Sequence, residues 1–304
     1  MDLEQMEAML PTKKRKPLAT PLSLVYLAIT TPKWGKTTFF SSFPEAVLIA
    51  FERGFQFQNV PTIFIDEWHN KDFEPYVDKD EVMHMTMTQC KQTLVASDKY
   101  KFLIIDTADM AAKKCSDYYL QKHRWQHAQD GGDFGRGYDI VQNTPFRQMI
   151  GALMATGRGI AFTTHQQINE TKMGKNKAGS SIVKKETSLP GGVYKYLHSQ
   201  ADLILHGSYG KRQPGNKHRD RIFQTEGDEE VLAGNRGKDI YLPSKYVVDP
   251  ARPYEQLAEF FVNPQASLEA DIGAIKEDRV DEDEDGARPL KKKVKKKLST
   301  QTRR

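Results

Sequence analysis

The chain contains 304 residues, of which 38% are hydrophobic, and it carries 45 Lys and Arg against 40 Asp and Glu. These proportions are typical of a soluble globular protein, and no apolar run approaches the ~20 residues that a membrane-spanning helix needs. Because the sequence also lacks the apolar core of a signal peptide, we expect a cytoplasmic protein that does not enter a membrane. The two cysteines form no C-x-x-C pair, so we expect neither a disulfide framework nor a structural zinc site.

Residues 1–19 include a run of basic residues, Lys13–Lys16. Such a run is compatible with a nuclear import signal, but short basic clusters are common in proteins. We therefore expect a flexible basic arm.

Residues 30–38, with the sequence Thr-Thr-Pro-Lys-Trp-Gly-Lys-Thr-Thr, have the pattern of a phosphate-binding loop. The loop follows a run rich in β-formers, residues 24–29, and precedes a short apolar stretch, so we expect a strand, a loop and a short helix. In such a loop the lysine ammonium reaches the β- and γ-phosphates and the hydroxyl after it binds Mg²⁺. The expected nucleotide-binding residues are Pro32, Lys33, Trp34, Gly35, Lys36, Thr37 and Thr38.

One position departs from the pattern, because the full signature begins with a glycine where this chain has Thr30. Threonine is β-branched and stiffer than glycine, so the substitution can change the geometry of the loop. Taken alone, the Gly-Lys-Thr tripeptide is also compatible with an ordinary surface loop, and the downstream sequence has to decide between the two.

Two further apolar runs end in an acid. Residues 101–107 are typical of a buried strand that ends at Asp106, whose carboxylate could hold Mg²⁺ through water in the Walker-B role. Residues 45–54 read as a second buried strand that ends in an acid, Glu52, and then a glycine, and Glu52 could orient or deprotonate the attacking water. Ligands of α/β folds bind at the carboxyl ends of the strands, so both acids are expected beside the loop. The alternative for Glu52 is a solvated glutamate at the end of a strand.

A fourth strand is expected at 158–164, and it is followed at once by His165 and Gln166. A polar side chain at this strand end can sense the γ-phosphate and pass its presence to the next loop. Either residue can instead be an ordinary hydrogen-bonding residue.

Two segments combine features that suit single-stranded DNA. Residues 118–127 interleave aromatic with basic residues, among them Arg124 and Trp125, although these aromatics can also be the buried face of a helix. Residues 169–185 form a basic, glycine-containing stretch that we expect to be a mobile loop able to track phosphates. Its candidate DNA contacts are Lys172, Lys175, Lys177, Lys184 and Lys185.

The last part of the chain contains a basic hairpin and a charged tail. Residues 211–221 separate two apolar strands, and Arg219 or Arg236 could reach a nucleotide in an adjacent subunit. From residue 263 an acidic block is followed by a basic block, and such segments cannot bury a core. We expect three parts: the arm at 1–19, an ordered core at 20–262 and a disordered acidic-then-basic tail at 263–304.

Together these elements resemble the RecA-core ATPases, and in particular the small phage-encoded RecA-like proteins of single-strand annealing and recombination. The likeness covers residues 20–262 and implies a RecA-like P-loop NTPase core of α/β class, with a mainly parallel sheet and helices on both faces. The motifs that carry it are Pro32-Lys33, Gly35-Lys36-Thr37-Thr38, Phe43-Pro44, Glu52 with Gly54, Ile104-Ile105-Asp106, Gly135-Arg136-Gly137-Tyr138, Thr164-His165, and Asn235-Arg236 with Pro243.

The resemblance implies an ATPase stimulated by single-stranded DNA, with ATP and Mg²⁺ as cofactors and with Lys36 and Glu52 as catalytic residues. Its role would be annealing or recombination in a phage, in the cytoplasm of a bacterial host. We expect a homo-oligomer that works beside a single-strand DNA-binding protein. The alternative is a nucleotide-binding interaction or replication-accessory protein, similar to a helicase loader, with weak or no hydrolysis.

Overall fold

The computed structural model describes residues 20–172, 181–210, 219–228, 231–236 and 241–271. The arm at 1–19, most of the charged tail, and the candidate DNA contacts Lys175 and Lys177 lie outside these described residues.

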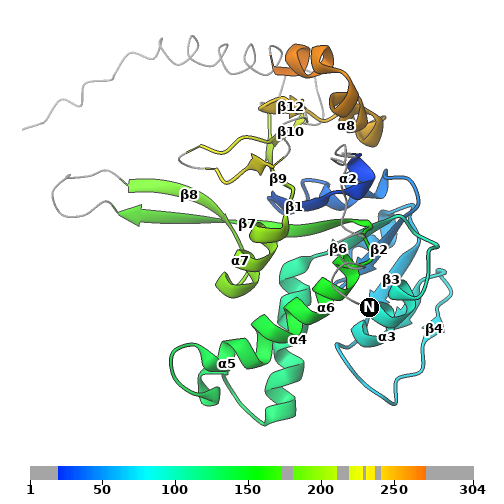
Figure 1. Cartoon of the computed structure of the whole chain (residues 1–304), viewed down its shortest axis with the longest axis vertical. Coiled ribbons are helices and arrows are strands. Elements are labelled where there is room, and N and C mark those ends of the chain that lie inside the picture. Colours follow the sequence, from blue (N-terminus) through cyan, green and yellow to red (C-terminus); the bar gives the residue numbers. More distant parts are fainter. Residues whose placement is uncertain (1–19, 173–180, 211–218, 229–230, 237–240, 272–304) are drawn as a thin grey trace, which may run out of the picture.

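The described strands form one sheet that runs through the molecule (Figure 1). Its order is β12-β10-β9-β1-β7-β6-β2-β3-β5-β4, while β11 pairs with β9 and β8 pairs with β7. The strands are β1 (Val25–Thr30), β2 (Ala46–Ala50), β3 (Thr62–Ile65), β4 (Tyr76–Val77), β5 (Met83–Met85), β6 (Phe102–Asp106), β7 (Gly159–Lys172), β8 (Ser181–Thr187), β9 (Leu203–Tyr209), β10 (Arg221–Gln224), β11 (Gly234–Asn235) and β12 (Lys245–Val247).

The centre of the sheet is parallel. Neighbouring strands from β9 through β1, β7, β6, β2 and β3 to β5 all run in the same direction. Antiparallel strands occur only at the margins and in the β7–β8 pair among the described residues. The central strands are continuous apolar runs because a parallel sheet covered on both faces buries every side chain.

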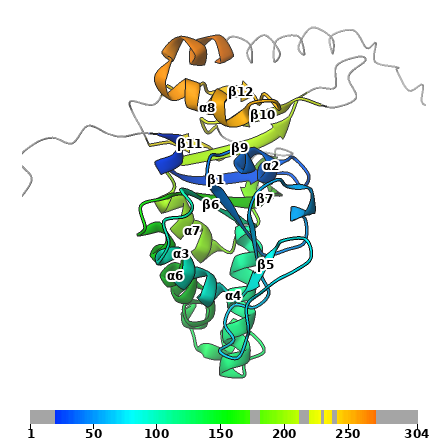
Figure 2. The same cartoon turned by 90° about the vertical axis from the view of Figure 1, so that its right-hand side faces the viewer.

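Helices cover both faces of this sheet (Figure 2). Helices α2 (Lys36–Ser41) and α8 (Pro253–Val262) pack on one face, in a cluster rich in aromatic residues. The other face is covered by α3 (Met87–Val95), α4 (Ala108–His123), α6 (Thr144–Met154) and α7 (Gly191–Gln200). The shorter helical segments are η1 (Pro21–Ser23), η2 (Phe55–Phe57), η3 (Ala128–Gly131), α5 (Arg136–Tyr138) and η4 (Asp139–Asn143). The expected α/β class, with a mainly parallel sheet and helices on both faces, is confirmed.

The described ends of the basic stretch at 169–185 are strands, which corrects the expectation of a loop there. Strand β7 continues to Lys172, and β8 begins at Ser181 and pairs with it in antiparallel register. The resulting hairpin extends away from the body of the molecule (Figure 1). The β-branched residues on both sides of the turn explain the difference, because they favour strands over irregular structure.

The ordered core also extends beyond the boundary expected at residue 262. Residues 264–271 are helical, and Asp271 accepts hydrogen bonds from the backbone N–H and the hydroxyl of Ser244, both at 2.7 Å. Ser267 is buried and its hydroxyl donates to the carbonyl of Tyr241. These contacts join the segment to the chain before β12.

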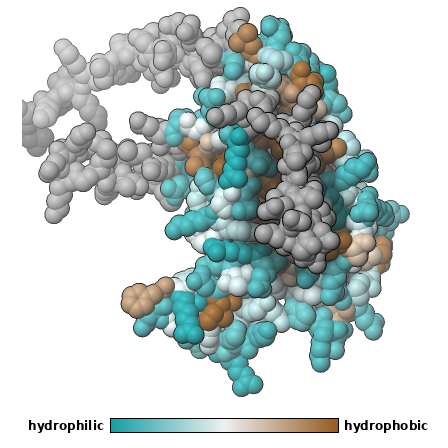
Figure 3. Space-filling model, in the orientation of Figure 1, coloured by the Kyte–Doolittle hydropathy of each residue, from teal (hydrophilic) through white to brown (hydrophobic). Residues whose placement is uncertain are grey.

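The surface is mainly hydrophilic on the face shown in Figure 3, with separate apolar spots. Phe57 and Phe134 are the most exposed large apolar residues among those described. Within the described part of the chain, every helix is too short or too polar to span a bilayer.

Candidate nucleotide-binding site

The expected phosphate loop connects β1 to α2. Lys36 begins the helix, and Gly35 before it has φ 100°, a left-handed conformation that favours glycine. Lys33 is also left-handed, with φ 64°. The strand, loop and short helix are therefore arranged as the sequence predicts.

Trp34 anchors the loop to the rest of the sheet. Its side chain is only 1% exposed, and its indole Nε1 donates to the carbonyl of Ser208 at 2.6 Å. The ring also lies 4.3 Å from that of Phe223, between centroids. Because the indole is enclosed in this way, a nucleotide contact of Trp34 would involve its backbone, and its assignment as a nucleotide-binding residue stays a prediction.

Thr30, which replaces the first glycine of the signature, is the last residue of β1 and is fully buried. It pairs with Gly207 of β9. A Cβ placed on Gly207 would lie 2.7 Å from Cγ2 of Thr30 and 2.8 Å from the Trp34 ring. The absence of a side chain at Gly207 thus leaves room for the side chains of Thr30 and Trp34.

Asp106 lies directly beside the first turn of α2. The hydroxyl of Thr37 donates to Asp106 Oδ2 at 2.9 Å, and the hydroxyl of Thr163 donates to Oδ1 of the same carboxylate. Strand β7 lies between β1 and β6, so Thr163 holds the acid from the intervening strand. Sequence reasoning missed Thr163, although its place near the end of an apolar strand was a signal.

Lys36 is almost buried, with 7% of its surface exposed. Burial lowers the pKa of its ammonium, while the charges of Asp106, Asp109 and Glu52 oppose this shift. Two of these acids, Asp106 and Glu52, are the ones that the sequence places at this edge of the sheet, and Asp109 is a third.

Glu52 follows β2, which pairs with β6 so that Ala50 is opposite Asp106. The hydroxyl of Thr107 donates to Glu52 Oε1 at 3.4 Å. Glu52 is half-buried, and it lies at the same edge of the sheet as Lys36 and Asp106. Its role as the residue that orients the attacking water stays a prediction.

His165 is held by Asp109, an acid that sequence reasoning did not select. His165 Nδ1 and Asp109 Oδ2 are 2.9 Å apart, and the hydroxyl of Ser188 donates to the same oxygen at 2.9 Å. Burial opposes ionisation of Asp109, but hydrogen bonds from His165, Thr107 and Ser188 outweigh it and lower the pKa of Asp109 to about 2. His165 ends the core part of β7 and Ser188 follows β8, so both ends of the β7–β8 hairpin are joined to the start of α4. Gln166 lies next to this group and pairs with Thr187.

The two segments expected to bind DNA lie on different parts of the molecule. Lys172, Lys184 and Lys185 belong to the β7–β8 hairpin. Arg124 and Trp125 lie at the far end of α4, whose 16 residues correspond to a length of about 24 Å. The Trp125 ring stacks on His123, with 4.7 Å between centroids. Of these predicted residues, none is in contact with the phosphate loop among the side chains that the structure describes.

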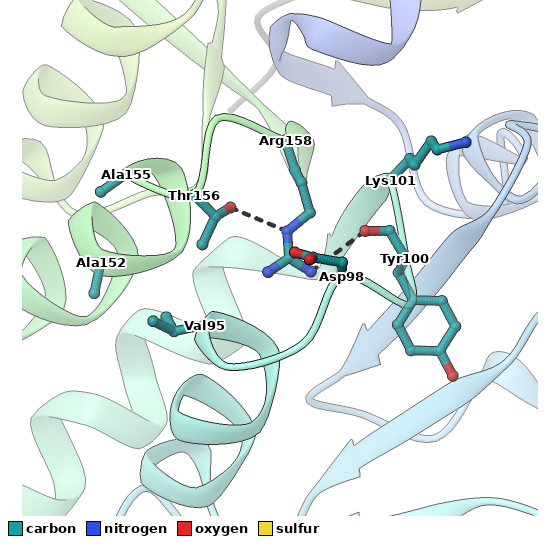
Figure 4. A pocket seen from close by; sticks show the side chains of 8 residues that line it. All are labelled: Val95, Asp98, Tyr100, Lys101, Ala152, Ala155, Thr156 and Arg158. Atoms are coloured by element: carbon teal, nitrogen blue, oxygen red, sulfur yellow. Dashed lines mark hydrogen bonds between the residues drawn. The ribbon is translucent and has the colours of Figure 1, made fainter.

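A cavity of about 460 Å³ lies at the opposite end of β6 and β7 (Figure 4). Its most polar lining residue is Arg158, which donates to the carbonyls of Leu94 and Tyr100 and to the hydroxyl of Thr156. These bonds occupy the guanidinium, so Arg158 connects α3 to the starts of β6 and β7.

Comparisons with known proteins agree with a P-loop domain. A family model described as an AAA domain matches residues 23–237, which is more than two thirds of the chain. No curated protein matches the chain in sequence. Similar solved structures include a KaiC-like protein from the hyperthermophilic archaeon Pyrococcus horikoshii OT3, with 13% identity, a TM-score of 0.34, and coverage of 75% of this chain and 87% of that chain. Another is the flagellar accessory protein FlaH from Methanocaldococcus jannaschii, with 7% identity, a TM-score of 0.35, and coverage of 75% and 86%. At these values the two structures add nothing on function.

Proposed function

The chain belongs to the AAA domain family, and from this premise we propose that it binds and hydrolyses ATP with Mg²⁺ and couples hydrolysis to single-stranded DNA. The observation that carries the proposal is the hydrogen bond between Thr37 and Asp106, next to the buried ammonium of Lys36. It joins the two halves of a nucleotide site that are 69 residues apart in the sequence.

The oxygen donors at this point suit Mg²⁺. The ion prefers hard oxygen ligands and commonly uses one or two carboxylates together with phosphate oxygens, and Thr37 and Asp106 supply one hydroxyl and one carboxylate. No group of three or more His, Cys, Asp or Glu side chains that could hold a metal occurs among the described residues, so phosphate oxygens would complete the set. When bound, Mg²⁺ neutralises negative charge on the phosphates.

Residues of the chain would bind the phosphates, activate the attacking water and sense the γ-phosphate. Lys36 and the backbone N–H groups of residues 33–38 would bind the phosphates. Glu52, held by Thr107, would orient the attacking water and accept its proton. His165 would respond to the γ-phosphate through its bond to Asp109.

Single-stranded DNA would bind along the β7–β8 hairpin and at Arg124 and Trp125. The support is the sequence of these segments, their resemblance to phage RecA-like proteins, and the hydrogen bonds by which His165 and Ser188 join the hairpin to Asp109. The role we propose is annealing or recombination in a phage, as a homo-oligomer beside a single-strand DNA-binding protein.

The test is ATP hydrolysis by the purified chain with and without single-stranded DNA. Lys36→Ala removes the loop ammonium, and Lys113→Ala removes an exposed lysine of α4 as the matched control. We expect stimulation by DNA that Lys36→Ala abolishes and Lys113→Ala retains. A rate of ATP hydrolysis that does not change when single-stranded DNA is added, in a chain that does not bind single strands, would contradict the proposal. ATP binding without turnover would support a nucleotide-dependent accessory protein similar to a helicase loader.

A further inference from the structure

Arg221 of β10 lies against the phosphate loop of its own chain. A Cβ placed on Gly35 would be 2.6 Å from Nη1 of Arg221 and 2.7 Å from its Cζ. The guanidinium therefore occupies the space beside the loop glycine that any other residue at position 35 would fill. Arg221 is 185 residues away from Lys36 in the sequence, and nothing in the local sequence indicates this contact.

The β9–β10 hairpin holds Arg221 in place. Arg221 pairs with Tyr209 across the hairpin, and the Tyr209 hydroxyl donates to the carbonyl of Lys33 at 2.8 Å. On the same strand Ser208 accepts the hydrogen bond from Trp34. Three consecutive loop residues, 33 to 35, thus contact the hairpin, so the guanidinium and the loop form one unit.

The charges around the Lys36 ammonium differ from those around the Arg221 guanidinium. Three carboxylates surround Lys36 and favour its charged form. Among the described residues, no carboxylate lies within ion-pair distance of Arg221. A second positive charge beside a basic loop is unfavourable unless an anion binds there, and the planar guanidinium fits phosphate oxygens with two parallel hydrogen bonds.

We infer that Arg221 binds the phosphates of a nucleotide held by residues 35–37 of the same chain, as a second cation besides Lys36. This inference rests on the proposed nucleotide function and adds a residue to that site. It also means that one chain supplies both cations. Of the arginines expected to reach a neighbouring nucleotide, Arg236 donates instead to the carbonyl of Ser199.

The experiment is a titration of the full-length chain with a fluorescent ATP analogue. Arg221→Ala and Arg221→Met both remove the charge, but methionine keeps most of the apolar stem. We expect each substitution to raise the Kd for the ATP analogue about 10- to 100-fold, as for the loss of hydrogen bonds to a charged group. Arg221→Lys should recover only part of the wild-type affinity, because an ammonium lacks the planar guanidinium that can form two parallel hydrogen bonds. Arg252→Ala, an exposed arginine of the α8 N-terminus, is the control and should bind as the wild type does.

The outcomes separate the two hypotheses. Thermal unfolding without nucleotide checks that each variant folds, and the rise in Tm on adding ATP gives a second measure of binding. Suppose that the wild type binds the ATP analogue, Lys36→Ala does not, and Arg221→Met binds it as tightly as the wild type does. Arg221 then only packs on the loop, and this inference is wrong. If the wild type binds no nucleotide, both the inference and the proposed function are wrong. An affinity that rises with protein concentration would contradict a site completed within one chain.

Discussion

Thr30 and Gly207 share a limited space at the end of the phosphate loop. The threonine is fully buried, and Gly207 opposite it has no side chain to collide with Thr30 or Trp34. The unusual residue in the signature therefore depends on a residue of another strand. Trp34 depends on the same position, because its indole donates to the carbonyl of the next residue, Ser208.

Gly207→Ala should destabilise the chain and weaken nucleotide binding together. The new Cβ would lie 2.7 Å from the Thr30 side chain, and forced overpacking of a core typically costs about 1–3 kcal/mol. Urea unfolding would measure the loss. Adding Thr30→Ala should restore part of it, because the two side chains compete for one space, and strictly additive effects would contradict this coupling.

Asp109 should make stability depend on pH in acid. Its pKa in the folded chain is about 2, below the ordinary value of 3.8, so folding favours the ionised form. The stabilisation is complete above the ordinary pKa and is lost as the pH falls through about 2. Asp109→Asn removes this charge, so the difference in unfolding free energy between wild type and variant should shrink by roughly 2 kcal/mol between pH 5 and pH 2.

Urea unfolding at several pH values would provide this comparison. Asp117→Asn, an exposed acid on the same helix, controls for the removal of one carboxylate. A gap between wild type and Asp109→Asn that stays constant across the pH range would show that the Asp109 charge is not selectively stabilised by folding.

At the scale of secondary-structure elements, the β7–β8 hairpin is joined to the nucleotide site by hydrogen bonds at its base. Asp109 lies three residues after Asp106, and it binds His165 from β7 and Ser188 after β8 through one oxygen. A shift of α4 at the nucleotide would therefore displace both strands of the hairpin. This provides a physical route by which bound DNA and bound nucleotide could influence each other.

Ser188→Ala should reduce the stimulation of hydrolysis by single-stranded DNA several-fold, while ATP binding without DNA stays within about twofold of the wild type. The substitution removes the two hydrogen bonds of the Ser188 hydroxyl, to Asp109 and to Thr164, of roughly 1 kcal/mol each, from the base of the hairpin and none from the loop. Ser199→Ala, on the exposed side of α7, is the control. Steady-state ATPase rates with increasing DNA give the measurement, and unchanged stimulation would argue against the route through Asp109.

The sequence predicts an element well when the contacts that define it join residues close together in the chain, and poorly when they join distant ones. The strand–loop–helix around Lys36 and the strand ending at Asp106 are local patterns, so the sequence predicts them correctly. The positions of Trp34, Gly207 and Arg221 depend on which strands become neighbours and in which register, and no local pattern contains that information. In the stretch 169–185 the lysines and glycines predict a loop, whereas the described residues on either side of 173–180 form strands, which their β-branched residues favour.

At the scale of the whole molecule, the order of the sheet brings residues from segments far apart in the sequence to one edge. Strand β7, inserted between β1 and β6, supplies Thr163 to Asp106 and His165 to Asp109. Strands β9 and β10 on the other side of β1 hold the loop. The face shown in Figure 3 is mainly hydrophilic. Because an interface between subunits can itself be largely polar, this surface does not distinguish a monomer from an oligomer, and oligomer formation stays a prediction.

The extent of the folded core can be tested by truncation. A chain that ends at Asp271 keeps every contact among the described residues, whereas one that ends at Val262 loses the helical segment 264–271. The shorter chain leaves the backbone N–H of Ser244 without its carboxylate partner and uncovers the apolar cluster against which Ala266 and Ala270 pack.

A loss of about 1–3 kcal/mol in the free energy of unfolding corresponds to a Tm lower by roughly 3–10 °C for a domain of this size. We therefore expect the chain ending at Asp271 to unfold at the same temperature as the full-length chain, and the chain ending at Val262 to unfold below it. Equal Tm values for the two truncated chains would place the boundary of the core at 262, as the composition of the tail alone suggests.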